Sequence, residues 1–256
     1  MRRRVGVAAV AVLASAAPAS AAETGDYPWD RRAESAGDYA KHRAGRVSFA
    51  VAGPDGRVRG HNVHARHRSA SVVKAMLLVA YLNEPGVRGG SLNSREKGVL
   101  RPMIVRSDNR AASRIRNVVG NDGLAKLARR AKMKDFAPSP SWGSTQISAY
   151  DQACFFRRID AFVPVRHRRY ARSLLASVVG RQRWGIPPAL PSGWGIYFKG
   201  GWLPPRVVHQ SALLERGETR IGISVLTDGD PSFEYGHQTI TGVTTRLLVG
   251  LNDYEV

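Results

Sequence analysis

The sequence predicts a mixed α/β (α+β) fold, in which both ends of the chain build one antiparallel sheet and an all-helical lobe lies between them. Three observations predict it: two strand-like segments near the N-terminus, a long run of helical segments, and three strand-like segments before a final helix. Such a layout brings the terminal segments together in one sheet, with helices packed against it. We expect the inserted helical lobe to span roughly residues 65–193.

The N-terminal part is expected to contribute one helix and a β-hairpin. Residues 23–44 are polar with interleaved small side chains, and we expect the first helix there. Val47–Val51 alternates as a strand does, Pro54-Asp55-Gly56 supplies a turn, and a second strand carries Val58 and His61.

The middle of the chain is expected to hold six helices separated by loops. They are predicted at residues 70–83, from about 94 to 104, 109–119, 122–131, 148–163 and 169–179. The first stops before Pro85, and a loop is expected over residues 86–91. Residues 136–144 are rich in proline and serine and are expected to form a loop. Ser148 is expected to cap the fifth helix, with Asp151 at its third position.

The C-terminal part returns to strands. Residues 194–198, 207–214 and 220–226 are predicted strands, with a hairpin turn over 215–218. Residues 233–251 are expected to close the chain as a helix.

The first 22 residues have the pattern of a secretory signal. Arg2-Arg3-Arg4 is followed by an apolar stretch over 5–17 and by Ala19-Ser20-Ala21-Ala22, which matches an A-x-A cleavage site. The apolar stretch is too short for a comfortable membrane span, and no later segment is long enough. We expect an exported protein of residues 23–256, monomeric and without a transmembrane span; the alternative is a leader that stays uncleaved as an N-terminal anchor.

The chain is strongly basic, with a formal net charge of +19 that falls to +16 without the three arginines of the leader. Such a charge favours anionic partners, which for an exported protein are wall polymers, anionic lipids or acidic substrates rather than nucleic acid. The alternative is a solvated basic surface with no specific partner. The single cysteine, Cys154, rules out an internal disulfide, and its apolar surroundings predict a buried small side chain.

Three short motifs carry the chemistry: Ser71-Val72-Val73-Lys74, Ser107-Asp108-Asn109 and Lys199-Gly200-Gly201. They nearly reproduce the S-x-x-K, S-D-N and K-T-G set of serine enzymes that recognise penicillin. S-x-x-K recurs at Ser94-Arg95-Glu96-Lys97, but only the Ser71 copy opens an apolar helical run. Each motif alone is weak; their order, spacing and context together predict a functional site.

The first motif pairs a nucleophile with a base. Helix positions i and i+3 share a face, so Ser71 and Lys74 can touch, and a neutral lysine could accept the serine proton. Lysine is neutral near pH 7 only if desolvation and neighbouring cations lower its pKa. We expect Lys199 to be such a neighbour and to bind a substrate carboxylate. Ser107 is a candidate proton relay, and Asn109 a candidate to position the substrate or Lys74.

On these motifs the chain resembles the superfamily of class A β-lactamases and penicillin-binding proteins, in its β-lactamase-like serine hydrolase branch. The resemblance implies a β-lactamase/transpeptidase-like fold with the site between the lobes, and an acyl-enzyme formed on Ser71 with Lys74 as general base. It further implies Ser107 as relay, substrate binding at Asn109, Lys199 and Gly201, and backbone N–H groups of Ser71 and Trp202 as the oxyanion hole.

The chain departs from the family pattern at three points. Gly200 replaces a threonine or serine, so a hydroxyl is missing. Residues 136–148 contain no glutamate where class A enzymes carry E-x-x-L-N; the nearest acids are Asp135 and Asp151. An arginine expected after Lys199 is not evident, although His209 or Arg206 could lie nearby. Slow deacylation is therefore expected.

Other residues point to no further chemistry. His61, His64 and His67 would alternate faces on a strand, so we expect no metal site, and no cofactor is implied. The leading hypothesis is a serine hydrolase acting on a β-lactam or a cell-wall peptide. The alternatives are a D,D-peptidase-like enzyme and a catalytically impaired protein that binds penicillin or the wall. The residues do not choose among substrates.

Overall fold

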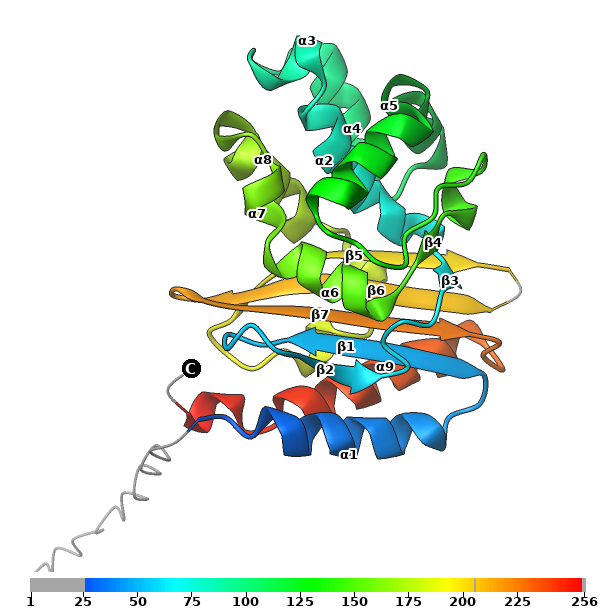
Figure 1. Ribbon diagram of the computed structural model, residues 1–256, viewed down its shortest axis with the longest axis vertical. Helices are drawn as coiled ribbons and strands as arrows, with labels where there is room; N and C mark the ends of the chain where they lie inside the picture. Colours follow the sequence, from blue (N-terminus) through cyan, green and yellow to red (C-terminus); the bar gives the residue numbers. More distant parts are fainter. Residues whose placement is uncertain (1–25, 205, 255–256) are drawn as a thin grey trace, which may run out of the picture.

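The computed structural model describes residues 26–204 and 206–254 as a five-stranded sheet with helices on both faces (Figure 1). The sheet order is β2-β1-β7-β6-β5, and all four pairings are antiparallel. Its strands are β1 (Arg46–Ala52), β2 (Val58–His61), β5 (Gly195–Leu203), β6 (Val207–Arg216) and β7 (Thr219–Asp228). The predicted mixed fold, with a sheet completed by both ends of the chain, is confirmed.

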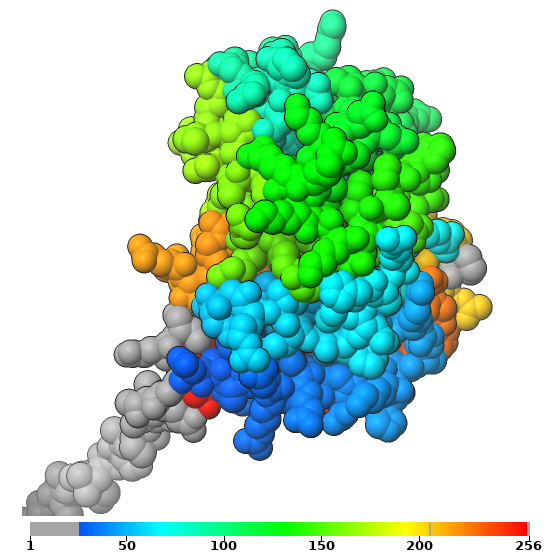
Figure 2. Space-filling view, in the orientation of Figure 1, coloured from blue at the N-terminus to red at the C-terminus, as the bar shows by residue number. Residues whose placement is uncertain are grey.

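Helices α1 and α9 lie side by side on one face of the sheet, and the other helices lie on the opposite face (Figure 1). The bounds are α1 (Trp29–Lys41), α2 (Val73–Leu82), α3 (Pro85–Arg88), α4 (Ser94–Val105), α5 (Asn109–Arg130), α6 (Ala149–Arg157), α7 (Ile159–Phe162), α8 (Arg168–Ala176) and α9 (Phe233–Leu248). Figure 2 shows the same division, with the helical lobe in green above the blue N-terminal segment. None of these described helices is long and apolar enough to cross a membrane.

Two apolar cores lie on the two faces of the sheet. Alternate residues of a strand point to opposite faces, so Phe49 and Val51 of β1 join the core under α1 and α9, while Ala50 and Ala52 join the core of the helical lobe. Helix α2 is buried on nearly all sides, which explains its almost continuous apolar sequence.

Several boundaries differ from the predictions. The segment expected to be a loop after Pro85 contains the short helix α3, which begins with proline at its first position. The helix expected over 148–163 breaks at Arg158 into α6 and α7, and residues 249–250 separate α9 from a final 3₁₀ turn at Leu251–Asp253. The predicted division between helices over 109–119 and 122–131 is confirmed, because Gly120 has a non-helical backbone with a φ of +67° and interrupts α5.

A second, two-stranded sheet was not predicted. It pairs β3 (His67–Arg68) with β4 (Gln146–Ile147). Each strand has only two residues and no alternating pattern, so neither can be recognised from sequence. The pairing ties the loop over residues 136–148 to the chain just before Ser71.

Candidate active site

The structure brings the three sequence motifs together on one cluster of hydrogen bonds. Lys74 Nζ donates to Ser107 O at 2.6 Å, to Ser107 Oγ at 3.1 Å and to Asn109 Oδ1 at 2.7 Å. Lys199 Nζ lies 3.1 Å from the same Ser107 Oγ and 2.7 Å from Gly200 O. Helix α2, the α4–α5 junction and strand β5 therefore meet at the Ser107 hydroxyl.

Ser71 lies in a 3₁₀ turn, Ala70–Val72, that precedes α2. Its side chain is nearly buried, with 8% exposure, and its Oγ forms no hydrogen bond to any described residue. Lys74, expected to touch it directly, instead directs its hydrogen bonds to Ser107 and Asn109. The preceding residue, Ala70, has a φ of +47°. This conformation is costly for a residue with a Cβ, and such strain concentrates at functional sites.

Ser107 is also held in the left-handed region, with a φ of +60°. It follows the end of α4, and the next residue, Asp108, caps α5 by accepting a 2.7 Å hydrogen bond from Ala111 N. The carboxylate of the S-D-N motif thus stabilises the helix start. This leaves Ser107 and Asn109, on either side, to face Lys74.

The two lysines are fully buried, and neither forms a salt bridge with a described carboxylate. Burial lowers the pKa of Lys74 to about 7, and the charge of Asp108 opposes the shift. Burial and the charge of Lys74 lower the pKa of Lys199 well below its usual range. Desolvation and repulsion from Lys199 were both expected to lower the pKa of Lys74, and the lowering comes from desolvation. The pair cannot readily carry two charges at neutral pH.

The backbone of strand β5 packs closely against the 3₁₀ turn that contains Ser71. A Cβ added at Gly201 would lie 2.6 Å from Ser71 N and 2.8 Å from Val72 N, so only glycine permits this approach. The next residue, Trp202, is 39% exposed, and its ring packs edge-on against Trp184. Trp184 also lies against Gly200, where a Cβ would be 3.3 Å from its ring. At Gly200, where the family has a serine or threonine, the Trp184 ring therefore packs against the backbone.

The loop without a glutamate lies over Lys74 and carries a tryptophan there. Trp142, in the 3₁₀ turn Trp142–Ser144, has its ring centroid 4.8 Å from Lys74 Nζ. Its Nε1 donates to Ser113 Oγ at 3.3 Å, and its carbonyl accepts from Ser69 Oγ at 3.2 Å. Sequence reasoning missed Trp142 because an aromatic side chain in a loop has no pattern that marks it.

The two acidic side chains near this loop bind partners outside the lysine cluster. Asp135 pairs with His64 at 2.8 Å. Asp151 is buried and accepts 2.8 Å hydrogen bonds from the backbone N of Lys134 and of Asp135, and burial raises its pKa. Ser148 caps α6 as predicted, by accepting from Asp151 N. Neither carboxylate contacts the lysine cluster.

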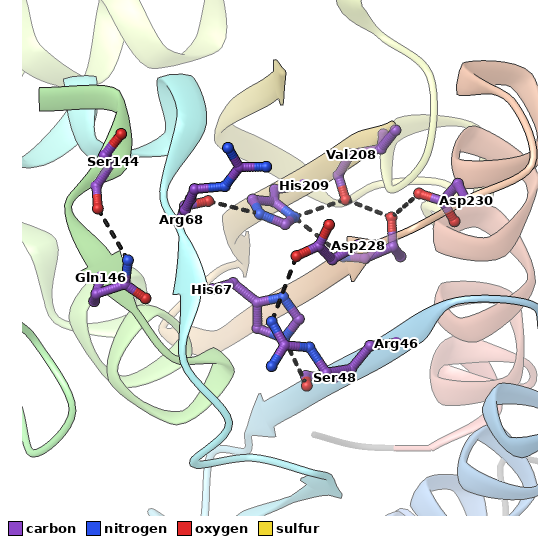
Figure 3. A network of polar contacts seen from close by, with 11 residues as sticks. Arg46, Ser48, His67, Arg68, Ser144, Gln146, Val208, His209, Asp228 and Asp230 are labelled. Carbon is purple, nitrogen blue, oxygen red and sulfur yellow. Dashed lines mark hydrogen bonds and ion pairs between the residues drawn. The ribbon is translucent and has the colours of Figure 1, made fainter. Parts of the chain in front are cut away.

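The residues considered in place of the missing arginine also lie outside the cluster. His209 is fully buried; its Nε2 lies 2.9 Å from Arg68 O, and its Nδ1 lies 3.1 Å from Thr227 N (Figure 3). Nδ1 also lies 2.8 Å from Val208 O, and Nε2 donates to Arg68 O because a carbonyl oxygen can only accept. His209 thus holds β3, immediately before the Ser71 turn. Arg206 is exposed and donates to Pro231 O at 2.8 Å.

The three histidines considered as metal ligands each contact a different partner. His61 stacks on Phe49, His64 pairs with Asp135, and His67 Nε2 lies 2.9 Å from Ser48 Oγ (Figure 3). No group of three or more His, Cys, Asp and Glu side chains in residues 26–204 and 206–254 could hold a metal ion. Cys154 is half-buried rather than buried, and burial raises the pKa of its thiol.

The sequence of the chain matches a known protein family. A family model described as the Beta-lactamase enzyme family matches residues 95–250, more than half of the chain. The chain belongs to this family. The match includes the Ser107 and Lys199 motifs and begins after Ser71 and Lys74, so the first motif stands on the geometry above. No curated protein matches the sequence.

Solved β-lactamases share the fold at low sequence identity. The β-lactamase from Sphaerobacter thermophilus DSM 20745 is 18% identical, with a TM-score of 0.73 over 90% of this chain and 100% of that one. The class A β-lactamase from Mycobacterium abscessus is 19% identical, with a TM-score of 0.72 over 86% and 99%. An ancestral class A β-lactamase is 18% identical, with a TM-score of 0.70 over 86% and 99%.

Proposed function

We propose that this member of the Beta-lactamase enzyme family is an exported serine hydrolase that forms an acyl-enzyme on Ser71 and releases it slowly. The observation that carries the proposal is the cluster in which Lys74 and Lys199 meet at Ser107 Oγ. Two buried lysines without a carboxylate partner are costly for stability. A site that retains them is well suited to proton transfer.

In the proposed acylation step, neutral Lys74 accepts the proton of Ser71 as Oγ attacks a substrate carbonyl carbon. The backbone N–H groups of Ser71 and Trp202 stabilise the oxyanion. The proton then passes through Ser107 Oγ to the departing amide nitrogen as the C–N bond breaks. The products of this step are the Ser71 ester and a neutral amine, and Lys74 returns to its starting state.

Slow deacylation follows from the residues around Lys74. Attack of water on the ester needs its own base, and a general base contributes about 10²–10⁴-fold. The loop over Lys74 offers the Trp142 ring, while Asp135 and Asp151 hold other partners. We therefore expect the acyl-enzyme to accumulate.

The substrate class we propose is a β-lactam or a cell-wall peptide amide. Lys199, on the edge strand β5, would donate a hydrogen bond to the carboxylate that both carry, and Asn109 would orient the amide. The family and the names of the similar structures favour the β-lactam.

The test is time-resolved intact-mass spectrometry with a penicillin, a cephalosporin and a wall peptide. The expected result is an adduct whose mass equals protein plus intact β-lactam, formed faster than it decays, and a chromogenic cephalosporin should give a burst followed by a slow steady state. Fast turnover with no accumulated adduct would overturn slow deacylation. Absence of any adduct would overturn the acyl-enzyme.

A second candidate is a penicillin-binding or wall-binding protein with impaired catalysis. It is favoured by the low exposure of Ser71 and by Lys74 directing its hydrogen bonds away from Ser71. Reversible binding of penicillin by equilibrium dialysis, without a covalent adduct, would select it. A D,D-peptidase-like enzyme would instead release the terminal residue of the wall peptide.

A further inference from the structure

The positive charge of the protein is concentrated in one half of it. Residues 65–193 contain 24 Lys and Arg against seven Asp and Glu, a net charge of +17. Residues 23–64 and 194–256 together contain 12 basic and 13 acidic side chains, a net charge of −1. General compositional drift would spread the excess over both halves, so the helical lobe requires its own explanation.

The basic side chains of the lobe are mostly not neutralised by acids. Among the described lysines and arginines of residues 65–193, Arg172 alone forms salt bridges, with Asp160 and Glu215. In the sheet half, by contrast, Asp30 and Asp55 neutralise Arg57 and Arg59. The lobe therefore presents a field that favours anions.

Part of this charge lines a cleft of about 710 Å³ between the loop before α4 and the start of α8. The cleft is lined by Gly90, Ser91, Leu92, Lys97, Arg166, His167, Arg169, Tyr170 and Ser173. No lining residue is acidic. Arg101 adds a further charge beside it: burial raises the pKa of Tyr170, and the positive charge of Arg101 opposes that shift.

Two basic side chains of the cleft hydrogen-bond to the backbone of its loop, while two others form no such contact. Arg166 donates to Gly89 O, and His167 Nε2 lies 3.1 Å from Val87 O, so these side chains hold the loop. Lys97 and Arg169 are exposed, and their side chains form no hydrogen bond or salt bridge to any described residue. They come from different helices, α4 and α8, and face one cleft.

We propose that this cleft binds a phosphate-bearing anion. Several cations on two walls suit a ligand with more than one negative charge, and guanidinium groups hydrogen-bond phosphate oxygens in pairs. The cleft shares no residue with the Ser71 cluster, so this binding is independent of the proposed hydrolase activity. It would hold the enzyme on a phosphate polymer or a phospholipid surface.

The test compares two double variants with equal net charge. Lys97→Ala/Arg169→Ala removes the two free cations of the cleft. Arg114→Ala/Arg129→Ala removes two exposed arginines of α5, whose side chains form no hydrogen bond or salt bridge to a described residue. Binding is measured by titration with sodium polyphosphate, with poly-glutamate as the carboxylate control, and by co-sedimentation with phosphatidylglycerol and phosphatidylcholine vesicles.

A cation near an anionic surface contributes about 1 kcal/mol, so the cleft variant should lose about 30-fold in affinity and the α5 variant much less. Binding to polyphosphate identifies a polymer source, and binding only to phosphatidylglycerol vesicles identifies a lipid source. Equal loss in both variants, equal affinity for poly-glutamate, or no binding to either phosphate source would overturn the proposal. Acylation by penicillin should be the same in wild type and both variants, which separates this test from that of the hydrolase.

Discussion

The two S-x-x-K segments have the same spacing and opposite surroundings. Ser71 is nearly buried after a left-handed residue, and Lys74 is fully buried with a pKa lowered to about 7. Ser94 is the first residue of α4, after the Asn93 N-cap, and both Ser94 and Lys97 are exposed. The spacing of serine and lysine is the same in both, but only desolvation lowers the pKa of a lysine enough for its neutral form, which can accept a proton, to be populated near pH 7.

The largest expected effect separates the two serines. Ser71→Ala should abolish the penicillin adduct in intact-mass spectrometry, because the attacking oxygen is gone. Ser94→Ala is the matched control and should label like the wild type. Equal labelling of Ser71→Ala and wild type would end the distinction between the two copies.

The next test separates the two lysines. Lys74→Arg should lower the acylation rate by about 10²–10⁴-fold, because arginine keeps the charge but does not deprotonate. Lys97→Arg should leave the rate unchanged. Rates come from stopped-flow with a reporter penicillin, and circular dichroism checks that both variants fold. An unchanged rate in Lys74→Arg would remove Lys74 as the base.

The contact of β5 with the Ser71 turn can be tested with neighbouring glycines. Gly201→Ala should slow acylation by about 10²-fold. The added Cβ would lie 2.6 Å from Ser71 N, so the backbone at Ser71 would have to shift, and the nucleophile would be misplaced. Gly200→Ala meets only the Trp184 and Gln210 side chains, at 3.3 Å or more, and should cost much less. Similar rates in the two variants would show that the approach of β5 does not position Ser71.

The smallest expected effect is on the pH profile. If neutral Lys74 is the base, the acylation rate should fall as pH falls through its pKa of about 7, by about tenfold from pH 8 to pH 6. The sign follows because the depressed pKa makes the neutral form dominant only above pH 7. The profile is measured as the adduct-formation rate at constant ionic strength. A flat profile over this range would exclude titration of Lys74.

Much of the fold was predictable because its elements have strong local patterns. The alternation in β1, the apolar run of α2 and the Ser148 cap each depend on nearby residues, and each prediction is confirmed. The pairing of β3 with β4 and the break at Arg158 were missed because they depend on contacts between distant segments or on packing.

The sequence by itself determined which motifs were candidates for the site: their order predicted a cluster, and the side chains of Lys74, Ser107 and Lys199 meet in the structure. It could not decide what surrounds that cluster. The Trp142 ring at Lys74, the His209 hydrogen bond that holds β3, and the burial that lowers the pKa of Lys74 all arise between segments far apart in the chain. Spacing is a property of the chain, whereas desolvation is a property of the packed molecule.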